Sequence, residues 1–193
     1  MVGFETLQSE LENVVARGRT MLIAIDGRGG AGKSTLARKL AESLSRATVV
    51  EVDDFWLPGT LRPGREKVIA EPGSDYDWHR LRDQVIWPLS NDEPGRYQRY
   101  DWSSDSLREW HDVSAGGVVI IEGVFSTREE LASFYDLRIW VETPEGVCLE
   151  RGYVKDGKEG RELWDREWMP AYENYINTNS PMTRADYVIE GAG

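Results

Sequence analysis

The strongest constraint on how this chain folds is a glycine-rich run set between two apolar patterns of different period. The run GRGGAGKST occupies residues 27–35 and directly follows MLIAID, residues 21–26. Glycine loses more conformational freedom on folding than other residues, so four glycines in nine positions need a structural reason. After the run, apolar residues recur at helical spacing, at Leu36, Ala37, Leu40, Ala41 and Leu44. The order of these patterns predicts a buried strand, a tight turn and then a helix.

The turn carries a spacing that points to a bound phosphate chain. Gly27 is followed by four residues and then by Gly32, Lys33 and Ser34, which is the phosphate-binding P-loop pattern. A phosphate chain lies against consecutive backbone N–H groups, where a Cβ would obstruct it, and the start of the next helix attracts anions. We therefore expect a nucleoside triphosphate to be bound by Gly27, Gly29, Gly30, Ala31, Gly32, Lys33, Ser34 and Thr35.

Two side chains of this turn have predicted roles. Lys33 supplies a positive charge for the β- and γ-phosphates, and the Ser34 hydroxyl is a ligand for Mg²⁺. The chain contains no Asn-Lys-x-Asp sequence of the kind that reads guanine. We therefore expect the cofactors to be ATP, rather than GTP, and Mg²⁺.

Five short apolar runs predict the strands of a sheet. They are residues 21–26, 48–53, 118–122, 137–142 and 187–190. Runs rich in Val and Ile that alternate with helical stretches are typical of a parallel sheet covered by helices on both faces. We expect an α/β fold, the three-layer P-loop NTPase fold with a mostly parallel five-stranded sheet, in one domain of residues 1–193.

Two segments do not fit a simple alternation of strands and helices. Residues 55–117 separate the second and third predicted strands, far more than the usual connection of about five residues. This segment is rich in proline and aromatic residues, and we expect an inserted, substrate-facing subdomain. Residues 151–166 are charged and broken by glycines, which suits a mobile lid; a solvated helix–turn–helix is the alternative. Most tryptophans of the insertion, such as Trp78, Trp87 and Trp110, are expected to pack in the core.

Composition limits the partners of the chain. The formal net charge of −11 argues against a nucleic-acid-binding protein, which usually carries basic stripes. Cys148 is the single cysteine and only two histidines are present, so neither a disulfide nor a zinc cluster is expected. No apolar run is long enough to span a membrane, and the N-terminus reads as an amphipathic helix rather than a signal peptide. We expect a cytoplasmic protein with no nucleic-acid or membrane partner; a homo-oligomer stays open.

Carboxylates stand at the ends of two predicted strands. Asp53 ends the second and Glu122 the third. Parallel sheets bind ligands at the carboxyl ends of their strands, so both side chains should face the γ-phosphate. A carboxylate there holds Mg²⁺ through water or accepts the proton of an attacking hydroxyl. Turn formation or helix capping is the alternative for the pair Asp53-Asp54.

Six motifs then follow one another along the chain: GRGGAGKST, VEVDDFW, SDYDWHRL, RYDW, VVIIEGV and RADYVIEG. Their order resembles that of the uridine kinase and phosphoribulokinase group of P-loop kinases, over roughly residues 21–191. The resemblance implies that Asp53 is the base that takes the proton of the acceptor hydroxyl, working with Lys33. It also implies a metal site formed by Ser34, Asp53 and Glu122.

The resemblance extends to the acceptor and the lid. Tyr76-Asp77 is similar to the Phe-Asp pair that holds ribose hydroxyls in that group, and Tyr100-Asp101-Trp102 is similar to the Tyr-Asp-Phe motif that stacks on the pyrimidine. Lid cations implied by the resemblance are Arg151, Lys155 and Arg161, with Arg166 as a further candidate. The expected substrate-binding residues are Trp56, Tyr76, Asp77, Tyr100, Trp102 and Asp105.

The identity of the acceptor stays open at this point. The group carries a histidine where this chain has Asp105, and an ionised carboxylate accepts hydrogen bonds but cannot donate them. We expect an ATP-dependent kinase whose partner is a small-molecule hydroxyl acceptor, in the first place a nucleoside such as uridine or cytidine. The alternatives are a kinase for another small alcohol, such as pantothenate, a sugar, a sugar phosphate or glycerate, and an ATP-binding regulatory switch.

Overall fold

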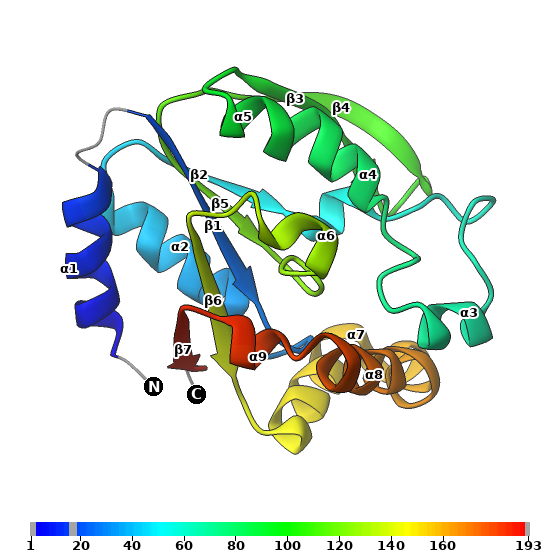
Figure 1. Cartoon of the computed structure of the whole chain (residues 1–193). Helices are drawn as coiled ribbons and strands as arrows, with labels where there is room; N and C mark the ends of the chain where they lie inside the picture. Colours follow the sequence, from blue (N-terminus) through cyan, green and yellow to red (C-terminus); the bar gives the residue numbers. More distant parts are fainter. Residues whose placement is uncertain (1–2, 16–18, 192–193) are drawn as a thin grey trace.

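The computed structural model describes residues 3–15 and 19–191, and a five-stranded parallel sheet lies at its centre (Figure 1). The strand order is β2–β5–β1–β6–β7, and each neighbouring pair is parallel. The strands are β1 (Thr20–Asp26), β2 (Ala47–Glu51), β5 (Gly117–Glu122), β6 (Leu137–Glu142) and β7 (Tyr187–Glu190). The predicted α/β class and five-stranded sheet are confirmed.

The central strand β1 shows why its sequence is an unbroken apolar run. All of its residues are buried. Ile23 and Ile25 belong to the core cluster on one face of the sheet, and Leu22 and Ala24 belong to the cluster on the other. A strand covered on both faces has no solvent-facing position, so its sequence does not alternate between apolar and polar residues.

The predicted second strand, residues 48–53, extends too far at its C-terminal end, and this part of the prediction is wrong. β2 stops at Glu51, whose partner in the ladder is Glu122, the last residue of β5. Because β5 offers no hydrogen bonds beyond that point, the chain turns into a short 3-10 helix, η1 (Val52–Phe55). Asp53 therefore lies just past the edge of the sheet instead of at the end of a strand.

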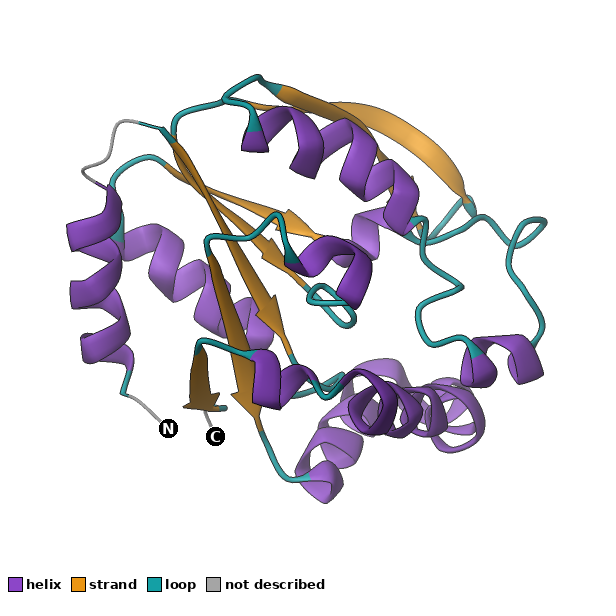
Figure 2. Ribbon diagram, viewed as in Figure 1, coloured by secondary structure: helices purple, strands orange, loops and turns teal. Residues whose placement is uncertain are grey.

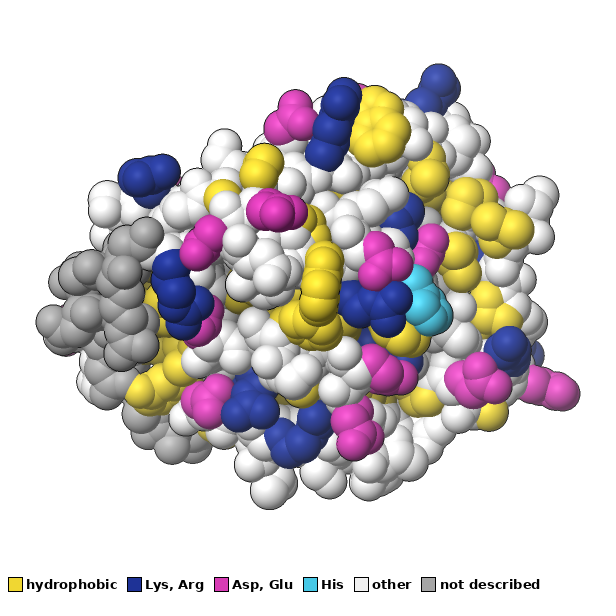
Figure 3. All heavy atoms as spheres, turned by 45° about the horizontal axis from the view of Figure 1, so that its top comes forward, with side chains coloured by type: hydrophobic (Ala, Val, Ile, Leu, Met, Phe, Trp, Pro, Cys, Tyr) yellow, Lys and Arg dark blue, Asp and Glu magenta, His cyan; other side chains and the backbone are white. Residues whose placement is uncertain are grey.

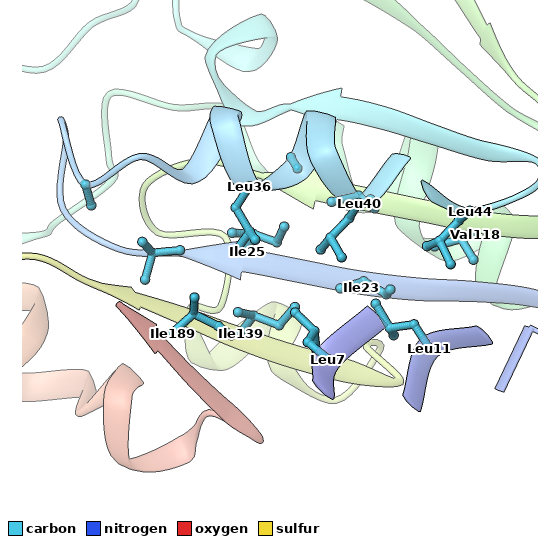
Figure 4. Close-up of a cluster of buried hydrophobic side chains, with 14 of the residues drawn as sticks. Leu7, Leu11, Ile23, Ile25, Leu36, Leu40, Leu44, Val118, Ile139 and Ile189 are labelled. Carbon is cyan, nitrogen blue, oxygen red and sulfur yellow. The ribbon is translucent and has the colours of Figure 1, made fainter. Parts of the chain in front are cut away.

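Helices α1 (Phe4–Val15) and α2 (Lys33–Ser43) cover one face of the sheet. Figure 4 shows leucines of both helices pointing toward the isoleucines of β1 and β6. The amphipathic helix expected at the N-terminus is present, with Leu7 and Leu11 buried. The apolar residues at helical spacing that predict this helix also include Val14 and Val15, whose side chains lie outside what the structure describes.

The opposite face is covered by one long helical stretch and a short helix, so the molecule has three layers (Figure 2). The stretch consists of α4 (Trp78–Leu81), the π-helical η2 (Arg82–Ile86) and α5 (Trp87–Ser90), and the short helix is α6 (Glu129–Ala132). Leu81, Val85 and Leu89 pack there against Leu22 and Ile121 of the sheet.

The segment between β2 and β5 also holds α3 (Arg65–Ala70) and an antiparallel hairpin, β3 (Gly95–Asp101) and β4 (Ser106–Val113). The expectation that its tryptophans pack in the core is wrong for Trp87 and Trp110, which are 57% and 51% exposed. Trp78 does pack against the core. On the face drawn in Figure 3, hydrophobic side chains form small separate patches among acidic and basic ones.

Most of the C-terminal helical segment lies beyond the carboxyl ends of β1 and β6, and its last short helix lies beside β6 (Figure 1). The segment consists of α7 (Glu145–Leu163), the π-helical η3 (Trp164–Trp168), α8 (Met169–Asn179) and α9 (Pro181–Arg184). Gly157 interrupts α7 with φ 67° and ψ −163°, so the charged segment 151–166 is helical with a break at a glycine. No helix in residues 3–15 and 19–191 combines the length and the apolar character needed to cross a membrane.

Candidate active site

The glycine-rich turn joins the end of β1 at Asp26 to the start of α2 at Lys33. Two of its glycines are required by close approach. Gly30 has φ +76°, and a Cβ there would come within 2.4 Å of the Cys148 carbonyl oxygen in α7. A Cβ on Gly29 would come within 2.6 Å of the Trp164 ring. The backbone of the turn is therefore held against α7 and η3.

Lys33 and Ser34 begin α2 beside a buried carboxylate. The Lys33 ammonium donates to the Arg28 carbonyl oxygen at 2.8 Å, which folds its side chain back over the turn. Ser34 follows Lys33 in the first turn of α2 and lines the cavity together with Glu122. Burial raises the pKa of the Glu122 carboxyl, and the Lys33 charge and the Ser34 hydroxyl oppose that rise. Glu122 is 5% exposed, so the Lys33 charge next to it makes its ionised form less costly.

The Asp26 carboxylate connects three parts of the site by hydrogen bonds. Its carboxylate accepts hydrogen bonds from the N–H groups of Gly27 at 2.7 Å, Phe125 at 3.1 Å and Thr127 at 2.9 Å. It also accepts from the hydroxyls of Thr127 at 2.6 Å and Tyr175 at 2.7 Å. One buried side chain thus links the glycine-rich turn, the loop after β5 and helix α8.

The two aspartates of η1 face different neighbours. Asp53 accepts a hydrogen bond from the Tyr76 hydroxyl at 3.3 Å. Asp54 is buried and accepts from the Tyr97 hydroxyl at 2.8 Å, and it forms an ion pair with Nε of Arg99 at 2.9 Å. Burial raises the pKa of Asp54, against the opposing effect of Tyr97 and Arg99. Asp54 therefore connects η1 to the hairpin, and both aspartates line the adjoining cavity.

A single cavity of about 870 Å³ brings these groups together. This volume lies toward the upper end of the range of small-molecule sites. Lys33 and Ser34 line one part of it, Asp53 and Glu122 another, and aromatic rings a third. The predicted residues that line it are Gly29, Gly30, Gly32, Lys33, Ser34, Thr35, Asp53, Trp56, Tyr76, Trp102, Glu122, Arg151 and Lys155.

Other predicted residues lie outside the lining of this cavity, namely Gly27, Ala31, Asp77, Tyr100, Asp105 and Arg161. Asp77 caps α4, where its side chain accepts from the Arg80 N–H at 3.0 Å. Arg161 lies over the ring of Tyr153, 4.1 Å from its centroid.

Tyr100 and Asp105 bind each other instead of facing the cavity. The buried Tyr100 hydroxyl donates to Asp105 at 2.6 Å. Asp105 also accepts from the Gly59 N–H at 2.9 Å and pairs with Arg62 at 3.1 Å. The carboxylate that stands in place of the family's histidine is thus used within the insertion.

Several lining residues were not among those predicted: Glu51, Asp54, Arg99, Gly123, Val124, Gly152, Asp156, Trp164, Trp168 and Tyr172. Trp164, Trp168 and Tyr172 recur every four residues, a spacing that indicates one face of a helix but does not tell core from cavity. Arg99 stands inside the RYDW motif, directly before Tyr100. Its place in a motif that predicts acceptor contacts is the sequence signal for its position at the cavity.

The oxygen atoms around Ser34 fit a Mg²⁺ ion. The Ser34 hydroxyl and the carboxylates of Asp53 and Glu122 line the same cavity, and oxygen ligands are those that Mg²⁺ prefers. Within the described residues no group of three or more His, Cys, Asp or Glu side chains is clustered as a metal site. Mg²⁺ commonly takes its remaining ligands from water and substrate phosphates, which suits so sparse a protein contribution.

Comparison with known proteins places the chain in a family. The sequence profile of the Phosphoribulokinase / Uridine kinase family matches residues 65–192. The chain belongs to this family. A uridine kinase of Halobacterium salinarum is 30% identical over 166 residues, covering 83% of this chain and 71% of that protein.

Two solved structures share the fold. A possible uridine kinase from Bacillus stearothermophilus superposes with a TM-score of 0.75 at 24% identity and covers 96% of each chain. A protein described as a candidate fructose transport system kinase, from Silicibacter sp. TM1040, has a TM-score of 0.69 at 22% identity, covering 98% of this chain and 100% of that one. The chain is therefore a member of a family of P-loop kinases with that family's fold.

Proposed function

We propose that the protein transfers the γ-phosphate of ATP to a hydroxyl group of a small metabolite, in the first place a nucleoside. The observation that carries this proposal is the shared cavity. Lys33 and Ser34 of the glycine-rich turn line it together with Asp53, Glu122 and a wall of aromatic rings. A protein that binds only a nucleotide needs no second binding site, whereas a kinase must bind two substrates next to each other.

In this proposal the chain contributes position and charge. The amides of residues 29–35 bind the phosphates, and Lys33 leaves the Arg28 carbonyl to pair with the β- and γ-phosphates. Asp53 orients the acceptor hydroxyl and takes its proton. The Tyr76 hydroxyl donates a hydrogen bond to the Asp53 carboxylate and so helps to orient it. Ser34, Asp53 and Glu122 would hold Mg²⁺, which would supply positive charge to the transferred phosphoryl group.

Two segments would serve the two substrates within a single kinase domain. Residues 55–117 supply the aromatic acceptor wall through Trp56, Tyr76 and Trp102. Residues 151–166 act as the lid, since Arg151 and Lys155 line the cavity and Arg151 donates to the Gly30 carbonyl oxygen at 3.1 Å. A cationic cover over the phosphates both adds charge and excludes water.

The test is an Asp53→Asn variant. We expect turnover to fall on the order of a hundredfold or more, because general base catalysis contributes about that much. Affinity for magnesium ATP, measured by calorimetry, should stay within a few-fold of the wild type. The matched control is Asp83→Asn, an exposed aspartate paired with Arg82 outside the cavity. Near-normal turnover of Asp53→Asn would show that Asp53 is not the general base.

A kinase for another small alcohol is the second candidate. It is favoured by the positions of Tyr100 and Asp105, which were expected to bind the substrate and instead bind each other outside the cavity lining. ADP release measured with a panel of nucleosides and other alcohols separates the candidates. Slow release that no acceptor stimulates would point instead to a regulatory switch.

A further inference from the structure

Arg99 is a cavity-facing cation that the proposed mechanism does not use. It lies on β3, two residues after Tyr97, at a bulge where the pairing with β4 shifts register between Gln98 and Tyr100. Both reach Asp54, Tyr97 by a hydrogen bond and Arg99 by an ion pair. Arg96, on the same strand, instead pairs with Asp112 and lies over the Trp110 ring outside the cavity.

Asp54 fixes the orientation of the Arg99 guanidinium. The carboxylate is 7% exposed and is itself held by Tyr97, so it is a rigid anchor. It contacts Arg99 at Nε, on one edge of the planar group. The described residues provide no hydrogen bond to the two Nη nitrogens, and the side chain is 47% exposed. Arg99 thus presents free N–H donors to the cavity in a preset direction.

The charge around Arg99 is already balanced. Its ion pair with Asp54 neutralises the guanidinium, and Glu51 lines the cavity nearby and also acts on Arg99. The other cations of the cavity, Lys33, Arg151 and Lys155, lie on the glycine-rich turn or on α7, where the triphosphate is proposed to bind. A second phosphate or a carboxylate beside Arg99 would face the negative charges of Asp54 and Glu51.

The cavity that Arg99 lines also offers flat apolar surface. Trp56 and Trp102 both line it, with ring centroids 5.2 Å apart, and Trp102 is 56% exposed. Indole faces of this kind stack on planar rings or on the apolar faces of sugars. The acceptor side of the cavity therefore combines a stacking wall with hydrogen-bond donors and no net positive charge.

We infer that Arg99 is a specificity-determining residue, whose Nη groups donate hydrogen bonds to an uncharged ring-containing acceptor stacked beside Trp102. The acceptor class is a nucleoside or a free sugar, with lone pairs on oxygen or ring nitrogen, and not a phosphorylated or carboxylated alcohol. This inference rests on the proposed kinase function. Asp54, which pairs with Nε of Arg99, is a positioning residue for that guanidinium.

The first measurement is ADP release by the wild-type protein with magnesium ATP and two sets of acceptors. Uncharged acceptors are uridine, cytidine, ribose and fructose; anionic acceptors are ribulose 5-phosphate, glycerate and pantothenate. We expect at least one uncharged acceptor to stimulate release more than every anionic one. An anionic acceptor that works best would overturn this inference but leave the kinase function standing. No stimulation by any acceptor would overturn both.

The second measurement compares variants on the stimulating acceptor. Arg99→Ala should raise the acceptor KM by on the order of tenfold to a hundredfold, the usual effect of losing a hydrogen bond from a charged group. The KM for ATP should stay within about twofold. Arg99→Lys keeps the positive charge but lacks the planar set of N–H donors of a guanidinium. Its acceptor KM should therefore lie between those of Arg99→Ala and the wild type.

Arg96→Ala is the matched control, because it removes an arginine from the same strand on the side away from the cavity. Its acceptor KM should equal that of the wild type. Thermal unfolding of each variant separates a folding defect from a binding defect. If Arg99→Ala folds and its acceptor KM matches that of Arg96→Ala, Arg99 does not read the acceptor.

Discussion

Asp75 is a buried carboxylic acid directly before Tyr76, a residue that lines the cavity. It is 3% exposed, and its Oδ1 atom has no hydrogen-bond partner among the described residues. Burial raises its pKa from an ordinary value of 3.8 to about 7, and the nearby charge of Glu167 adds to the rise. Its own backbone N–H opposes the rise only in part. Near neutral pH the folded protein therefore holds a proton that the unfolded chain releases.

The sign of the resulting pH dependence follows from proton binding. Between about pH 4 and pH 7 the folded state binds more protons at Asp75 than the unfolded state does, so the stability that Asp75 contributes is lost as pH rises. We predict that the free energy of unfolding of Asp75→Asn, relative to that of the wild type, increases from pH 5 to pH 8. The increase is a few kcal/mol, at about 1.4 kcal/mol per pKa unit.

Urea unfolding at pH 5 and at pH 8 measures the difference in the free energy of unfolding between Asp75→Asn and the wild type. Asp112→Asn is the control, because the Asp112 side chain is 79% exposed and its replacement should give the same difference at both pH values. If the Asp75→Asn curve follows the wild type in parallel from pH 5 to pH 8, Asp75 is already ionised in the folded protein.

Single residues of the site were predictable to different degrees. The glycine-rich turn was predictable because its geometry depends on consecutive residues, which the spacing from Gly27 to Ser34 records directly. Asp105 was not, because its partners Gly59 and Arg62 lie 46 and 43 residues away in sequence. A side chain's use in a distant contact leaves no trace in its local pattern.

At the scale of elements, the hairpin β3–β4 is joined to η1 through the Tyr97–Asp54 hydrogen bond. We predict that Tyr97→Phe destabilises the protein by about 1–3 kcal/mol, because a buried carboxylate loses one of its partners. That corresponds to a fall of several degrees in the thermal midpoint. Calorimetry checks it against Tyr153→Phe, whose hydroxyl contacts Asp165 at the surface and should have little effect. Equal midpoints for Tyr97→Phe and the wild type would mean that Asp54 does not depend on the hydrogen bond from Tyr97.

The strands were easier to predict than the insertion between them. A strand buried on both faces, such as β1, must be a continuous apolar run, so its sequence suffices. In the insertion, Trp110 lies on the outer side of the hairpin under Arg96, and exposed Trp87 contacts Phe134, with ring centroids 6.0 Å apart. Which face of a hairpin or helix is covered depends on what packs against it, and aromatic content does not reveal that.

At the scale of the whole molecule, the cavity is assembled from segments that are distant along the chain. The glycine-rich turn, the end of β2, the hairpin and the helices α7 and α8 all contribute lining residues. The hydrogen bonds to Asp26 link the turn to the loop after β5 and to α8. A ligand that fills the cavity therefore contacts elements from most of the chain, so binding should stabilise the fold as a unit.

This gives a prediction that needs no knowledge of the acceptor. A ligand that binds only the folded state at a hundred times its Kd stabilises it by about 2.7 kcal/mol. For a chain of this size, magnesium ATP should raise the thermal midpoint by roughly 5 to 10 °C, measured by calorimetry against magnesium alone. Lys33→Ala should lose most of that rise, since it removes the charge proposed to face the phosphates. Lys39→Ala, at an exposed position on the same helix, should keep it. A rise that persists undiminished in Lys33→Ala would place the nucleotide elsewhere, and with it the acceptor roles assigned to Asp53 and Arg99 would lose their basis.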